Sequence, residues 1–144
     1  MKHPLHGSWV LKNCILSFSD GRPSKNPYQK GMISYHRNSL MQASLSTHPR
    51  AALSFSDLEQ GYRLSLEEKA ECFDNFLCYA GRYTYTDTDV SHHVELSLNP
   101  TIIGTTLVRQ YHIEQEQLLL SYEYTVRSNL QCLYQLYWQR SEQI

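Results

Sequence analysis

Residues 105–140 read TTLVRQYHIEQEQLLLSYEYTVRSNLQCLYQLYWQR, and this stretch decides the class of fold. Apolar and polar residues alternate through 105–114, 117–127 and 131–140, which is the period of a β-strand with one buried face. The links between these segments are only a few residues long. A parallel crossover needs a dozen residues or more, so we expect these strands to pair in antiparallel fashion.

Further strand patterns, separated by turn residues, precede this stretch. Eight antiparallel strands leave two unpaired edges unless the sheet closes, and closure into a barrel removes both. We therefore predict an all-β fold: an eight-stranded antiparallel up-and-down barrel formed by a single domain over 1–144. Such a barrel is just wide enough to hold one small ligand. The upstream strands are expected at 8–18, 31–36, 40–46, 82–87 and 91–98.

One α-helix is predicted at about 66–80, between the third and fourth strands. Ser65 and Glu68 have the spacing of a capping box, and Gly81 is a typical residue after a helix end. Apolar side chains recur every three or four residues along this segment, so we expect one face of the helix to pack on a large surface. That apolar stripe consists of Leu66, Ala70, Phe73, Leu77 and Ala80.

Composition excludes several classes of function. Lys and Arg total 13 against 14 Asp and Glu, a net charge of −1, which offers no basic surface for nucleic acid or an anionic membrane. The chain has no apolar run of about 18 residues that could span a bilayer. Residues 1–7 lack the apolar core of a secretion signal, so we expect a cytoplasmic protein with reduced thiols.

Placing the apolar face of each strand inside the barrel carries polar aromatic side chains and one arginine inward with it. An interior filled for stability alone would favour Leu, Ile and Val. Buried phenols and a guanidinium instead need hydrogen-bond partners, from one another or from a ligand. The inward-facing set comprises Tyr83, Tyr85, Tyr111, Tyr122, Tyr124, Tyr134 and Arg109.

The strand at 91–98 allows two orientations. Its apolar residues Val94, Leu96 and Leu98 favour placing His92 inside, whereas a polar cavity would favour His93 and Glu95. Adjacent strand residues point to opposite faces, so His92 and His93 cannot bind one metal ion together. His93 and Glu95 would supply only two ligands, so we predict no metal site.

Five segments, in order, resemble the lipocalin-like domain family of bacteria and fungi. The first, Gly7-Ser8-Trp9, is similar to the G-x-W signature of lipocalins. The resemblance implies a calycin-type barrel, and lipocalins pair this Trp with an Arg of the last strand, which makes Trp9 and Arg140 an expected structural pair. Related barrels serve as carriers, cyclases and pericyclic catalysts. The other similar segments are Gly31–Tyr35, Tyr79–Tyr83, Ser91–Pro100 and Gly104–Arg109.

These observations predict binding of a small, largely apolar, oxygen-bearing organic molecule inside the barrel, without a cofactor. Flat phenol rings with one polar tip suit planar, oxygenated molecules. Arg109 either holds a carboxylate or carbonyl of that molecule, or packs on tyrosine rings and backbone carbonyls. The expected ligand-contacting residues are Tyr83, His92, Arg109, Tyr111, Tyr122, Tyr124 and Tyr134.

Two other functions remain open at this stage. In the first, the same pocket belongs to a cofactor-free cyclase or isomerase of a polyketide- or terpenoid-type pathway. The candidate catalytic residues are then Arg109, His92 and Tyr122, which would polarise a carbonyl while the barrel holds one substrate conformer. In the second, side chains fill the barrel and its outer surface binds a partner. The sequence shows no G-x-S-x-G elbow and no Gly-rich phosphate loop.

Overall fold

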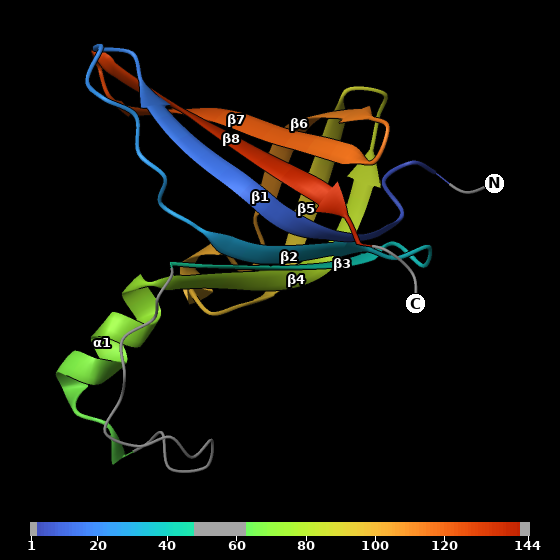
Figure 1. Ribbon diagram of the computed structural model, residues 1–144. Coiled ribbons are helices and arrows are strands. Elements are labelled where there is room, and N and C mark those ends of the chain that lie inside the picture. Colours follow the sequence, from blue (N-terminus) through green and yellow to red (C-terminus); the bar gives the residue numbers. More distant parts are fainter. Residues whose placement is uncertain (1–2, 48–62, 142–144) are drawn as a thin grey trace.

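The chain forms a closed barrel of eight antiparallel strands in sequence order, as seen in a computed structural model that describes residues 3–47 and 63–141 (Figure 1). Each strand pairs with the next, and the last pairs with the first, so the sheet closes on itself. The predicted fold class is confirmed. The strands are β1 (Gly7–Phe18), β2 (Lys30–Tyr35), β3 (Leu40–Ser46), β4 (Phe76–Tyr85), β5 (Asp89–Ser97), β6 (Thr106–Glu114), β7 (Gln117–Arg127) and β8 (Leu130–Arg140).

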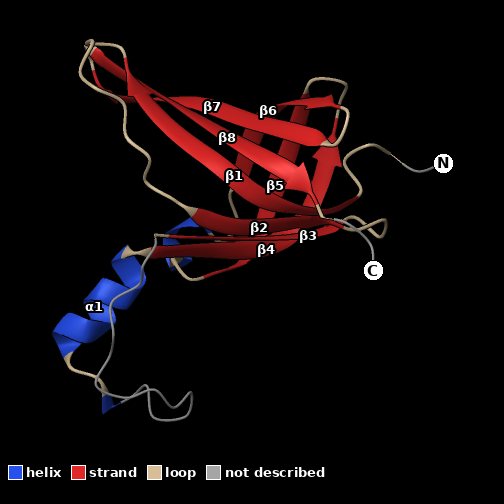
Figure 2. Ribbon diagram, viewed as in Figure 1, coloured by secondary structure: helices blue, strands red, loops and turns tan. Residues whose placement is uncertain are grey.

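The two ends of the barrel differ (Figures 1 and 2). The first and last described residues, 3 and 141, lie at one end, which we call the N-terminal end, while the helix α1 (Leu66–Asp74) projects from the other, which we call the helix end. The short 3-10 helix η2 (Pro100–Ile102) follows β5 at the helix end. Within the described residues, no helix has both the length and the apolar character needed to cross a membrane.

The helix ends six residues earlier than predicted. The capping box is present: Ser65 Oγ accepts from the backbone N–H of Glu68, and the Glu68 carboxylate accepts from that of Ser65. After Asp74, however, the chain enters β4 and pairs with β3 from Ser46↔Phe76 onward. The run from Phe76 to Tyr79 is rich in aromatic and apolar residues, so pairing with β3 overrides the helical spacing.

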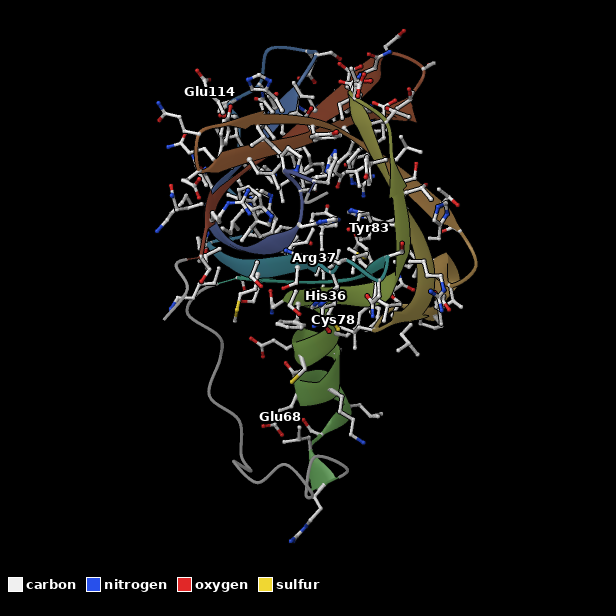
Figure 3. The ribbon with its side chains drawn as sticks, turned by 90° about the vertical axis from the view of Figure 1, so that its right-hand side faces the viewer. His36, Arg37, Glu68, Cys78, Tyr83 and Glu114 are labelled. Atoms are coloured by element: carbon white, nitrogen blue, oxygen red, sulfur yellow. The ribbon has the colours of Figure 1, made fainter. Side chains whose placement is uncertain are left out.

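The expected packing of the helix is also wrong. Leu77 and Ala80 belong to β4, and α1 contains no buried residue. Leu66, the first residue of the predicted stripe, is 84% exposed. Figure 3 shows the helix, with Glu68 on it, extending away from the barrel. The helix therefore contributes little to the core, and the stability of the fold rests on the sheet.

A β-bulge in β5 reverses the faces predicted for the residues that follow it. Tyr79 and Ala80 pair with Ser97 and Leu96, but Gly81 pairs with Val94, so Glu95 is the extra residue. Because the bulge reverses the alternation, Leu96 points outward and is 70% exposed, contrary to the prediction. A Cβ on Gly81 would lie 1.9 Å from the carbonyl oxygen of His93, which explains glycine at this position.

Candidate ligand-binding site

The deepest polar group inside the barrel is His92, held between two tyrosines. It is 1% exposed and faces inward with Val90 and Val94, which confirms the first of its two predicted orientations. Its Nε2 lies 2.7 Å from the hydroxyl oxygen of Tyr35 on β2, and its Nδ1 lies 2.7 Å from that of Tyr79 on β4. Three strands thus bring these side chains together in a buried Tyr35–His92–Tyr79 trio.

All three members of the trio are uncharged at neutral pH. Burial, and then the charge of Arg109 and the proximity of His93, lower the pKa of His92 from 6.5 to about 3. Burial raises the pKa of both hydroxyls, and the charge of Arg109 opposes that rise. The imidazole is therefore a very weak base, and the trio acts through hydrogen bonds rather than through charge.

Arg109 lies on the half-buried inner face of β6 and stacks on Tyr122 of β7. Its guanidinium carbon is 3.6 Å from the centre of the Tyr122 ring, a cation–π contact. One N–H group donates to the carbonyl of Val108, with a distance of 3.2 Å. Among residues 3–47 and 63–141, no carboxylate forms an ion pair with Arg109. The guanidinium thus keeps most of its donors available, and its charge acts on the trio nearby.

Tyrosine rings continue from Arg109 along β7 and β8. The Tyr122 and Tyr134 rings are stacked, with centres 5.0 Å apart and an interplanar angle of 17°. Tyr124 stacks on Tyr134 in turn, with centres 6.0 Å apart. Burial, followed by the effect of Tyr124, raises the pKa of Tyr134 to about 12. These rings form a flat, uncharged wall that begins at the arginine.

Other predicted site residues lie elsewhere or have their hydroxyls engaged. Tyr83 is buried, and its hydroxyl donates to the carbonyl of His36 at the N-terminal end (Figure 3). Tyr111 donates to the carbonyl of Thr86, 2.6 Å away. Tyr124 and Tyr85 stack on Tyr134 and Tyr83, on the predicted face, but they are 41% and 45% exposed, so the barrel does not enclose them. Strand alternation predicts which face of the sheet a residue occupies but not its position along the barrel axis. Both residues lie near strand ends, where the barrel opens to solvent.

The structure therefore brings together His92, Arg109, Tyr122 and Tyr134 from the predicted set, and adds Tyr35 and Tyr79. Sequence reasoning missed Tyr79 because its segment was assigned to the helix. Tyr35 ends a strand whose faces had not been assigned. Both residues do occur in the family-like segments Gly31–Tyr35 and Tyr79–Tyr83, and that was the one available signal.

The expected structural pair closes the N-terminal end. The guanidinium carbon of Arg140 lies 4.2 Å from the centre of the buried Trp9 ring. Its N–H groups donate to the carbonyls of His6 and Pro4, both 2.7 Å away, and Nε lies 2.9 Å from the Glu116 carboxylate. A Cβ on Gly7, whose φ is +126°, would lie 2.9 Å from this guanidinium, so glycine keeps the space open.

His93 faces outward and lies between two threonines. Its Nε2 and Nδ1 are each 3.0 Å from a hydroxyl, of Thr84 and Thr106 respectively. Glu95 approaches Arg82 at 3.8 Å instead of turning toward His93. Within the described part of the chain, no three His, Cys, Asp or Glu side chains are grouped to hold a metal ion.

The outer surface of the barrel also carries apolar grooves. One has a volume of about 750 Å³ and runs along β1, β2 and β3, where Val10 and Met32 are exposed. A second, of about 570 Å³, lies beside Leu40 and Leu96. Neither groove is lined by Arg109 or by the trio, so the concentrated polar chemistry lies inside the barrel.

A closed up-and-down barrel with inward-facing polar and aromatic side chains defines a class of small-molecule-binding β-barrels. The sequence profile of the lipocalin-like domain matches residues 6–141, nearly the whole chain. The protein belongs to the lipocalin-like domain family, whose barrel is suited in general to binding apolar ligands. No curated protein matches the chain in sequence.

Proposed function

We propose that this protein binds a small, largely apolar, oxygen-bearing organic molecule inside its barrel. The observation that carries the proposal is Arg109, an inward-facing guanidinium without a carboxylate partner among the described residues. An unpaired cation in a partly buried site is unfavourable unless another group satisfies it. A carbonyl or carboxylate of a ligand would do so, while the stacked tyrosines would contact its apolar part.

Two tryptophan variants at adjacent positions on β6 test whether binding occurs inside. Leu107 is half-buried and packs against the core, whereas the neighbouring Val108 is exposed on the outer face. Binding is measured by the fluorescence of N-phenyl-1-naphthylamine, a neutral apolar probe. We expect Leu107→Trp to weaken probe binding about tenfold or more, because the larger ring would take up space on the inner face of β6 that the probe would need, while Val108→Trp retains it.

A third variant covers the outer groove. Met32 is exposed there, so Met32→Lys places a charge in that groove without touching the interior. Probe binding that survives Leu107→Trp and disappears in Met32→Lys would contradict an interior site. Circular dichroism and urea unfolding of each variant establish that it folds before its binding is compared.

The same site residues also determine how the protein would act if it were a cyclase or isomerase. Two kinds of donor, the Arg109 guanidinium and a phenol of the trio, would stabilise negative charge developing on a carbonyl oxygen. Proton abstraction by His92 is disfavoured at neutral pH because its pKa is about 3. A catalyst built on this site would therefore act by holding one substrate conformer and by electrostatic stabilisation, with binding as its first step.

A further inference from the structure

The hydrogen-bond count of the Tyr35–His92–Tyr79 trio leaves one proton without an acceptor. A neutral imidazole has one N–H donor and one acceptor nitrogen. One tyrosine must therefore donate to His92 and the other must accept from it, whichever tautomer is present. The accepting tyrosine keeps its own O–H, and among the described residues neither hydroxyl has a second partner. A buried hydroxyl in this state favours an incoming acceptor.

Two further side chains inside the barrel have N–H donors without a partner among the described residues. Arg109 has N–H groups beyond the one that donates to Val108. The indole N–H of Trp138 is buried and has no partner among the described residues, where it is the only buried side-chain nitrogen or oxygen in that condition. No buried side-chain acceptor in residues 3–47 and 63–141 lacks a partner. The interior thus presents donors and one positive charge.

From this inventory we propose that the ligand is an anion: an apolar molecule ending in a carboxylate, whose oxygens accept hydrogen bonds from Arg109 and from the free hydroxyl of the trio. This inference rests on the proposed function and specifies the head group of its ligand. A carboxylate offers only acceptors and carries the charge that Arg109 lacks nearby. An alcohol would satisfy the hydroxyl but not the charge, and an ammonium group would be repelled.

Three probes with one chain length and different head groups test the proposal on the unaltered protein. Decanoate, 1-decanol and decylamine each compete with N-phenyl-1-naphthylamine at pH 7.5. We expect decanoate to displace the probe at about 10- to 100-fold lower concentration than decanol, because its head group gains charge-assisted hydrogen bonds. Decylamine is expected to be the weakest competitor.

Two arginine variants then test whether Arg109 is the source of the preference for decanoate over decanol. In Arg109→Met the advantage of decanoate over decanol should fall to about twofold or less, since the cation is gone. Arg82→Met is the matched control, because Arg82 is exposed on the outer face beside Glu95, and it should keep the full advantage. The comparison of the three probes does not depend on either variant, so it remains decisive if Arg109→Met fails to fold.

The outcomes separate this inference from the proposed function. If the probe binds inside and decanol competes as well as decanoate, the anion inference is overturned while apolar binding stands. The same conclusion follows if Arg109→Met keeps the preference for decanoate. If neither the neutral probe nor any of the three competitors binds inside the barrel, the proposed function itself fails, and this inference fails with it.

Discussion

Two arginines of this barrel lie on aromatic rings, and their surroundings differ. Arg140 covers Trp9 at the N-terminal end and is also bonded to two backbone carbonyls and to the Glu116 carboxylate. Arg109 covers Tyr122 inside the barrel, but its one hydrogen bond among the described residues goes to the carbonyl of its own neighbour, Val108. Both guanidinium groups contact an aromatic ring, so the two arginines differ in their hydrogen-bond and ion-pair partners.

The difference separates a structural arginine from one that is available to a ligand. The donors of Arg140 tie the N-terminal segment to the last strand, so the side chain stabilises the folded state. The donors of Arg109 have few protein partners, so its contribution to folding is small and its capacity to bind an anion is retained.

The largest expected effect is the loss of stability in Arg140→Met. This change leaves two carbonyls and the Glu116 carboxylate without their donor, and we expect the free energy of unfolding to fall by about 3 kcal/mol. Arg109→Met should change it by less than about 1 kcal/mol, because one backbone bond and one ring contact are lost. Urea unfolding at pH 7 measures the free energy of unfolding of both variants. Equal losses would show that Arg109 is as much a structural residue as Arg140.

Acid should destabilise the fold through the interior trio. The pKa of His92 is about 3 in the folded protein and about 6.5 in the unfolded chain, so between these values only the unfolded chain binds the proton. The contribution to stability is complete above pH 6.5 and declines as the pH falls toward 3. At pH 4.5 we expect a loss of about 2–3 kcal/mol relative to pH 7.

The control for this pH dependence is His92→Gln. Glutamine keeps one donor and one acceptor between Tyr35 and Tyr79 but does not titrate in this range. The other titrating groups are the same in both proteins, so the difference between their pH profiles isolates His92. The free energy of unfolding of both proteins is measured with urea from pH 7 to 4.5. Parallel pH profiles would show that His92 is not the cause of the loss of stability in acid.

A smaller effect is expected for the contact between Arg109 and Tyr122. The guanidinium lies 3.6 Å from the ring centre, and a cation–π contact of this kind contributes about 0.5–1 kcal/mol. A double-mutant cycle with Arg109→Met and Tyr122→Leu should give a coupling energy of that size in urea unfolding. A coupling near zero would mean that the ring does not hold the guanidinium in place.

The smallest effect on global stability is expected at the helix end. Ser65→Ala removes the cap of α1, but the helix buries no residue, so the global free energy of unfolding should change by less than about 0.5 kcal/mol. Amide exchange of residues 66–74 should nevertheless become faster, and Ser65→Asp should restore protection because aspartate also caps. A large global loss in Ser65→Ala would show that α1 supports the barrel.

Sequence reasoning predicted the barrel well because its evidence is local. Alternation along each strand and short links give the strand order, and β7 at 117–127 has the predicted bounds. The predicted helix was too long because the apolar spacing from Leu66 to Ala80 fits a helix. In the structure, the last part of this segment pairs with β3 and forms a strand instead. The bulge at Glu95 could not be found from alternation either, since it depends on how β4 and β5 pair.

The site was predictable only in part, for a related reason. The face of a residue follows from alternation, which correctly placed His92 and Arg109 inside. The contacts between strands depend on register and tilt, and these bring Tyr35 and Tyr79 to the two nitrogens of His92. The same limit explains why Tyr85 and Tyr124, on the expected face, are exposed near strand ends.

The account is tested most directly by the Nε–H resonances of the two arginines in ¹⁵N-labelled protein, with Arg109→Met used for assignment. On titration with decanoate, the Arg109 signal should shift and saturate together with the binding curve from calorimetry, while the Arg140 signal stays unchanged. If decanoate binds and the Arg109 signal does not move, the ligand's oxygens do not meet this guanidinium, and the central claim is contradicted.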